Sequence, residues 1–155
     1  MIPFRHLTPA EIDALPPGLV AVVPVAGVRL IGRHHPVSWL ARLVGRGPQI
    51  VVRGRRIFWP GLEADFSASP LHMSLLAHEL IHVWQYENGM TLWRYVLRER
   101  GRYAYRVDGR AFTEYGYEQQ AAMVEDWMRL RAGLGARWGV NAGAENLTAT
   151  IPFLG

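Results

Sequence analysis

Hydrophobic residues change their spacing several times along the chain, and these changes predict the secondary structure. Residues 19–31 are β-branched and apolar with breaks at Pro24 and Gly27, which favours one or two short strands. Two apolar runs, 50–52 and 57–59, flank the charged turn RGRR and predict a β-hairpin.

Helices are predicted before, between and after these strands. Thr8 can cap a short first helix and Glu11 can close its capping box, and two prolines and a glycine at 16–18 stop it. The C-terminal residues show no sustained period, so we expect a tail that docks on the core as a strand or lies in a cleft. Further helices are predicted at 34–48, 90–101 and about 117–131.

The longest predicted helix carries the main chemical signal of the chain. It begins near Pro70, where Ser67 or Ser69 can cap it, and it ends at Asn88 and Gly89. Its centre reads AHELIHVWQ, an apolar stretch that contains two histidines and one glutamate. We therefore expect the helix to be buried on most sides.

Length and composition predict one α+β domain. The chain has 155 residues, of which 50% are hydrophobic, enough for one core and too few for two. We expect a β-rich part at 1–69, a helical part with the functional site at 70–133 and a tail at 134–155. The absence of cysteine excludes disulfides, thiolate metal sites and cysteine nucleophiles.

The N-terminal residues give no sign of a cleavable signal peptide or of a membrane span. The first 18 residues lack a charged segment followed by an unbroken apolar stretch, and the apolar segment that follows is short and interrupted. The sequence therefore predicts a cytoplasmic protein, and it leaves open an export route that reads no cleavable signal.

Arginine supplies all 17 basic residues and a net charge of +4. A basic chain can bind nucleic acid, but the complete lack of lysine indicates a composition bias of the whole chain. A solvated basic face explains the densest run equally well, so nucleic-acid binding is the least favoured function. The run comprises Arg94, Arg98, Arg100, Arg102, Arg106 and Arg110.

The motif H-E-x-x-H at 78–82 indicates a metal site. His78 and His82 lie four residues apart, so on a helix they share one face and can direct their ring nitrogens at one ion. Glu79 is rotated by about 100 degrees, which places its carboxylate beside that ion. The alternative is a pair of hydrogen-bonded core histidines with Glu79 as their salt partner.

A catalytic zinc site needs a third protein ligand, and acidic residues downstream are the candidates. Glu118 opens a helix whose next face positions, Ala121 and Ala122, are small enough to let it approach the motif helix. Glu125 shares the face of Glu118 and can orient a ligand histidine through a hydrogen bond, and Asp126 is the rival for that role.

HELIH followed at a distance by EQQA resembles the gluzincin branch of zincin metallopeptidases. The resemblance implies His78, His82 and Glu118 as zinc ligands and Glu79 as general base. It also implies a zincin-like fold with a small antiparallel sheet packed on the motif helix and a C-terminal glutamate helix. Segments from 55 to 127 further resemble short bacterial proteins known as Vgr-related, a name that points to type VI secretion.

The resemblance also suggests where substrate would bind and which group would stabilise the transition state. In zincins an edge strand above the motif helix pairs with the substrate backbone, and Ile57, Phe58 and Trp59 are the candidates here. A tyrosine commonly supplies the extra hydrogen bond to the oxyanion, and Tyr115 or Tyr105 is expected in that role.

The sequence therefore predicts a zinc-dependent metallopeptidase that cleaves peptides or proteins with a metal-bound water activated by Glu79. One alternative is an inert zincin-fold accessory module with a partner in a secretion system. The second alternative is an arginine-rich protein that associates with nucleic acid.

Overall fold

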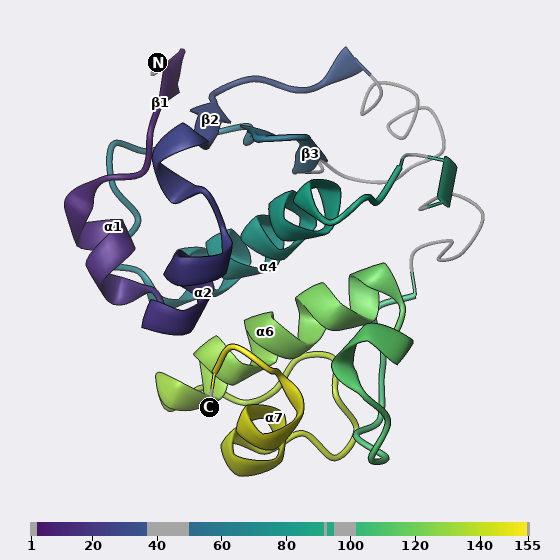
Figure 1. Ribbon diagram of the computed structural model, residues 1–155. Coiled ribbons are helices and arrows are strands. Elements are labelled where there is room, and N and C mark those ends of the chain that lie inside the picture. Colours follow the sequence, from purple (N-terminus) through teal and green to yellow (C-terminus); the bar gives the residue numbers. More distant parts are fainter. Residues whose placement is uncertain (1–2, 37–49, 92, 95–101, 155) are drawn as a thin grey trace.

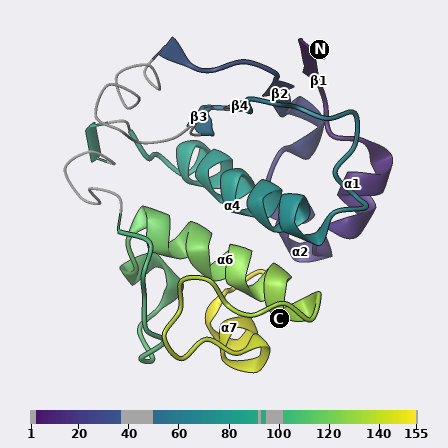
Figure 2. The same ribbon diagram turned by 180° about the vertical axis from the view of Figure 1, so that it is seen from behind.

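The computed structural model describes residues 3–36, 50–91, 93–94 and 102–154. Helix α4 (Pro70–Glu87) runs through the middle of the molecule, between a small sheet with two short helices and the C-terminal helices (Figures 1 and 2). Ser69 caps α4 by accepting a hydrogen bond from the backbone N–H of His72. Because α4 has neighbours on opposite sides, its apolar residues surround it rather than forming one stripe.

The sheet contains four short strands in the order β1-β2-β4-β3. The pairs β1–β2 and β3–β4 are antiparallel and β2–β4 is parallel. The predicted α+β class and hairpin are therefore confirmed, whereas the sheet is mixed and not purely antiparallel. The strands are β1 (Phe4–Arg5), β2 (Arg29–Ile31), β3 (Val51–Arg53) and β4 (Arg56–Phe58).

Strand β4 has neighbours on both sides, so the prediction that Ile57, Phe58 and Trp59 form an edge strand is wrong. The backbone N–H of Trp59 continues the pairing by donating to the carbonyl of Ile31 at 2.8 Å. A hairpin sequence fixes which two strands pair with each other, but it does not tell which of them receives a third strand. Among the described strands, β1 and β3 are the edges.

The segment 19–31, predicted to hold one or two short strands, contains one of them, β2, at its end, and its earlier part is helical. Helix α1 (Pro9–Ala14) has the predicted capping box of Thr8 and Glu11. A second helix, α2 (Pro17–Val22), and a 3₁₀ turn, η1 (Val25–Gly27), follow before β2 begins.

The physical reason for this error is that a proline can begin a helix as well as interrupt a strand. Pro17 occupies the first turn of α2, where its fixed φ favours a helix and its missing N–H costs nothing. Leu19 and Val23 are buried while Ala21, which would share their face in a strand, is exposed, so burial in this segment follows a helical spacing rather than strand alternation.

The C-terminal residues form a further helix rather than the expected tail. Helix α7 (Ala144–Thr150) packs on α6 (Tyr117–Arg131), and buries Leu147. Ile151, four residues later, is also buried, so a stripe of only two residues fixes this helix. A short 3₁₀ turn, η2 (Phe112–Glu114), precedes α6.

Two predicted helices, at 34–48 and 90–101, fall largely on residues outside the described part of the chain. Within the described part, no helix combines the length and apolar character needed to cross a bilayer.

Candidate metal centre

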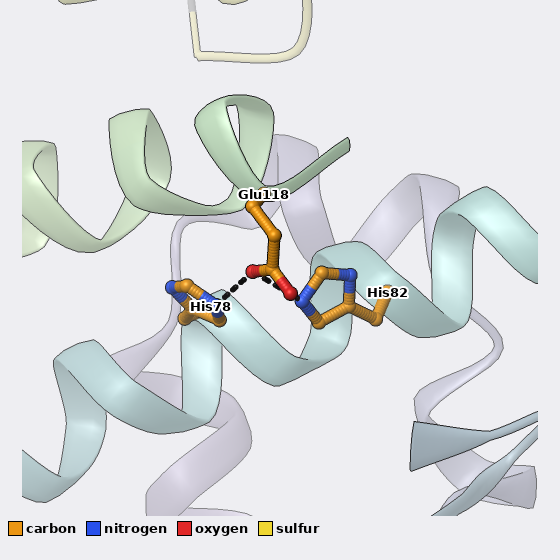
Figure 3. Close-up of side chains that lie close together, drawn as sticks. All are labelled: His78, His82 and Glu118. Atoms are coloured by element: carbon orange, nitrogen blue, oxygen red, sulfur yellow. Dashed lines mark hydrogen bonds and ion pairs between the residues drawn. The ribbon is translucent and has the colours of Figure 1, made fainter. Parts of the chain in front are cut away.

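Helices α4 and α6 lie side by side and bring three side chains to one point. His78 and His82 project from α4, and Glu118 from the first turn of α6 lies between them (Figure 3). The helices approach closely because Ala121 and Ala122 are small and fully buried. The structure thus brings together the three residues that the sequence analysis grouped as ligands.

The donor atoms of these side chains converge. Glu118 Oε2 lies 3.3 Å from His78 Nε2 and 3.2 Å from His82 Nε2. One ligand atom from each residue lies within 4.8 Å of the other two. Two imidazole nitrogens and one carboxylate oxygen form a donor set of the kind found in catalytic zinc sites. The residues present therefore fit a divalent cation such as Zn²⁺.

The other ring nitrogen of each histidine is held by an oxygen acceptor. His78 Nδ1 lies 3.0 Å from Glu125 Oε2, and His82 Nδ1 lies 2.8 Å from Gln85 Oε1. In both rings, these contacts hold a proton on Nδ1, so Nε2, which faces Glu118, is the nitrogen that would bind a metal ion. Gln85 is fixed in turn, because its amide donates to Gln120 Oε1 at 3.0 Å.

Sequence reasoning missed the contribution of Gln85. Its position three residues after His82 places it on the same helix face, and this spacing was the available signal. The alternative of a histidine pair held by Glu79 does not describe the observed contacts, since the carboxylates bonded to His78 belong to Glu118 and Glu125.

The site is buried and strongly electronegative. Burial opposes protonation of His78, but the hydrogen bonds that it donates to the carboxylates of Glu118 and Glu125 outweigh burial and raise its pKa to about 10. Burial likewise opposes the charge on His82, and Glu118 raises its pKa. Burial also opposes ionisation of Glu118, yet the two histidines lower its pKa. The negative field that retains these protons would also attract a divalent cation, which must displace them in order to bind.

Glu79 is buried next to this cluster. Burial raises its pKa, against the opposing charges of His78 and His82. A carboxylate whose pKa is shifted toward neutrality is a better proton acceptor for catalysis near pH 7 than an ordinary exposed one.

Asp126, the predicted rival of Glu125, performs a different task. Its carboxylate accepts backbone N–H groups from residues 137–139 and the hydroxyl of Tyr105 at 2.9 Å. Glu125 is the residue that contacts His78. One residue along a helix turns a side chain by about 100 degrees, and only the packed structure decides which side faces the histidine.

The two tyrosines expected to stabilise a transition state have other partners. Tyr105 donates to Asp126, and burial raises its pKa, with a further rise from that carboxylate. The hydroxyl of Tyr115 donates to Asp108 Oδ1 at 2.9 Å. These contacts give both residues a structural role and offer no support for a role at the metal centre. The ring of Tyr103 lies 6.0 Å from that of His78.

These observations define the chain as an α+β domain with a buried cluster of two histidines and one glutamate between two packed helices. No protein-family model matches the sequence, and no curated protein does. The structure is similar to the effector domain of Pseudomonas aeruginosa VgrG2b, with a TM-score of 0.68 and 23% sequence identity. The match covers 97% of this chain and 83% of the other, and it shows that the two share a fold.

Proposed function

We propose that this protein is a zinc-dependent metallopeptidase with His78, His82 and Glu118 as ligands and Glu79 as general base. The observation that carries the proposal is the convergence of Glu118 with the Nε2 atoms of both histidines inside a buried site. The likeness to an effector domain supports a role as a secreted effector with a partner in a type VI secretion apparatus.

Zinc in this site would supply a Lewis acid that polarises the peptide carbonyl and lowers the pKa of water to about 7. Glu79 accepts the proton of the attacking water and transfers it to the leaving amine. Glu118 would offset one of the two positive charges of the cation, and the two histidines would bind it as neutral imidazoles. Glu125 and Gln85 hold the histidine rings in position through their Nδ1 atoms.

Substrate binding by strand addition remains part of the proposal, but on a different strand. Strand β4 is enclosed by β2 and β3 and cannot pair with a peptide. Of the two edge strands, β3 contacts α4, which carries the metal-binding histidines. We therefore propose β3 as the strand that pairs with the substrate backbone.

The test measures zinc content and hydrolysis of a fluorescent casein. Wild-type protein should retain one zinc per chain, Glu118→Ala should bind it more than about a hundredfold more weakly, and Glu79→Gln should retain it without hydrolysing casein. Glu145→Gln, which removes the same charge at an exposed position, is the control. Equal hydrolysis by Glu79→Gln and wild type would exclude this mechanism.

Zinc binding by the wild-type protein without hydrolysis of any protein substrate would instead favour the inert accessory module. The structure adds no specific support for nucleic-acid binding. Arg110 is paired with Asp108 at 2.9 Å and lies over the ring of Tyr115, and Arg98 and Arg100 lie outside the described residues.

A further inference from the structure

The loop at 137–139 is tied to the metal centre through two adjacent carboxylates of α6. Asp126 binds the backbone of the loop, with the N–H groups of Arg137 and Gly139 at 2.6 and 2.8 Å. Glu125 binds its side chains, as the indole N–H of Trp138 donates to Oε2 at 2.9 Å and Arg137 donates to Oε1 at 3.2 Å. The loop thus contacts the carboxylate that holds His78.

A single carboxylate oxygen joins the loop to the metal ligand. Glu125 Oε2 lies 2.9 Å from Trp138 Nε1 and 3.0 Å from His78 Nδ1. Glu125 is almost completely buried, so its orientation depends on these protein donors. Without the indole N–H, the charge of Arg137 at the other oxygen would be the remaining loop contact, and it would draw the carboxylate toward itself.

The indole ring is itself held in place by two neighbouring side chains. The ring of Tyr103 stacks on Trp138 at 4.7 Å, and the guanidinium of Arg137 lies 4.4 Å from the centre of the indole. Gly139 allows the loop to approach the core, because a Cβ there would lie 2.7 Å from the ring of Tyr105. The donor atom of Trp138 therefore has a defined position rather than one among several rotamers.

We propose that Trp138 is a positioning residue of the metal centre. Its indole N–H holds the Glu125 carboxylate in the orientation that fixes the ring and the tautomer of His78, so that Nε2 of His78 faces the ion. The inference rests on the proposed metal site. It adds that the centre is completed by a loop near the C-terminus, distant in sequence from the ligand that it orients.

The test compares two tryptophans by their effect on metal binding. Trp138→Phe removes the indole N–H and keeps an aromatic ring in the stack. Trp127→Phe is the matched control, because the indole N–H of Trp127 donates to Thr148 on α7, at 2.8 Å, and not to a residue of the centre. Zinc affinity is measured by competition with a chromophoric chelator, and cobalt(II) absorption reports the geometry of the site.

We expect Trp138→Phe to weaken zinc binding about tenfold and to shift the cobalt bands, and Trp127→Phe to do neither. In a Glu125→Ala background, the Trp138→Phe substitution should cause no further loss, because the indole acts through that carboxylate. Should Trp138→Phe fail to fold, Gly139→Ala provides a second variant, since it displaces the loop against Tyr105 and should also weaken zinc binding.

The possible failures are distinguishable. If the wild-type protein binds no zinc, the proposed function fails and this inference with it. If the wild type binds zinc and the affinities of Trp138→Phe and Trp127→Phe are equal, the metal centre stands and the role of Trp138 is overturned. An additional loss from Trp138→Phe in the Glu125→Ala background would also overturn it, because the indole would then act by another route.

Discussion

Replacing Asp126 by asparagine should separate the stability of the C-terminal loop from the chemistry of the site. Asp126 is fully buried and lies next to Glu125, but it contacts neither histidine in the described structure. Its carboxylate instead binds the loop that follows α6 and the hydroxyl of Tyr105. The substitution keeps the shape of the side chain and removes the charge and one acceptor.

The expected cost follows from the hydrogen bonds on each oxygen. Oδ1 accepts the N–H of Arg137 at 2.6 Å and, at 3.4 Å, that of Trp138, whereas Oδ2 accepts Trp138, Gly139 and Tyr105 at 3.1, 2.8 and 2.9 Å. The substitution destabilises the protein least when the asparagine NH₂ takes the place of Oδ1, because only one short charge-assisted hydrogen bond, from the N–H of Arg137, is then lost. An N–H of the new amide group then faces the N–H of Arg137. This costs about 2–3 kcal/mol, which lowers the Tm of a domain of this size by about 4–12 °C.

Thermal and urea unfolding of the metal-free proteins measure this cost. Glu145→Gln is the control, since it makes the same change of charge at an exposed position and should alter the free energy of unfolding by less than about 0.5 kcal/mol. Equal stability of Asp126→Asn and Glu145→Gln would refute the view that the Asp126 carboxylate holds the loop.

Two further predictions concern pH and packing. Burial lowers the pKa of His78, but the surrounding carboxylates raise it to about 10 from 6.5, so its contribution to stability is complete below pH 6.5 and is lost as the pH rises through about 10. The Tm of the metal-free protein should therefore fall over this range, and a rising Tm would contradict the assignment. Gly18→Ala places a Cβ 1.6 Å from the carbonyl oxygen of Phe153 and should cost about 1–3 kcal/mol in urea unfolding. Gly135→Ala serves as its control, because a Cβ at Gly135 meets no atom within 4 Å. Equal urea midpoints for the two variants would show that Phe153 does not pack closely against Gly18 of α2.

The sequence by itself determined the features that depend on near neighbours in the chain. The capping box of Thr8 and Glu11, the hairpin of β3 and β4 and the extent of α4 all follow from residues a few positions apart. The shared face of His78 and His82 follows from helical geometry alone. The place of Glu118 beside the two histidines could also be predicted, because the small residues after it indicated a close approach of two helices.

Only the tertiary structure decided the features that depend on which surfaces meet. The pairing of β4 with β2, the choice of Glu125 over Asp126 and the hydrogen bond from Trp138 to Glu125 join segments far apart in sequence. Helices α2 and α7 are too short to be recognised from the spacing of their hydrophobic residues. Each is held by a pair of buried side chains, Leu19 and Val23 for α2 and Leu147 and Ile151 for α7. Local patterns carry no information on such contacts, because packing selects one partner from several residues of equal chemical type.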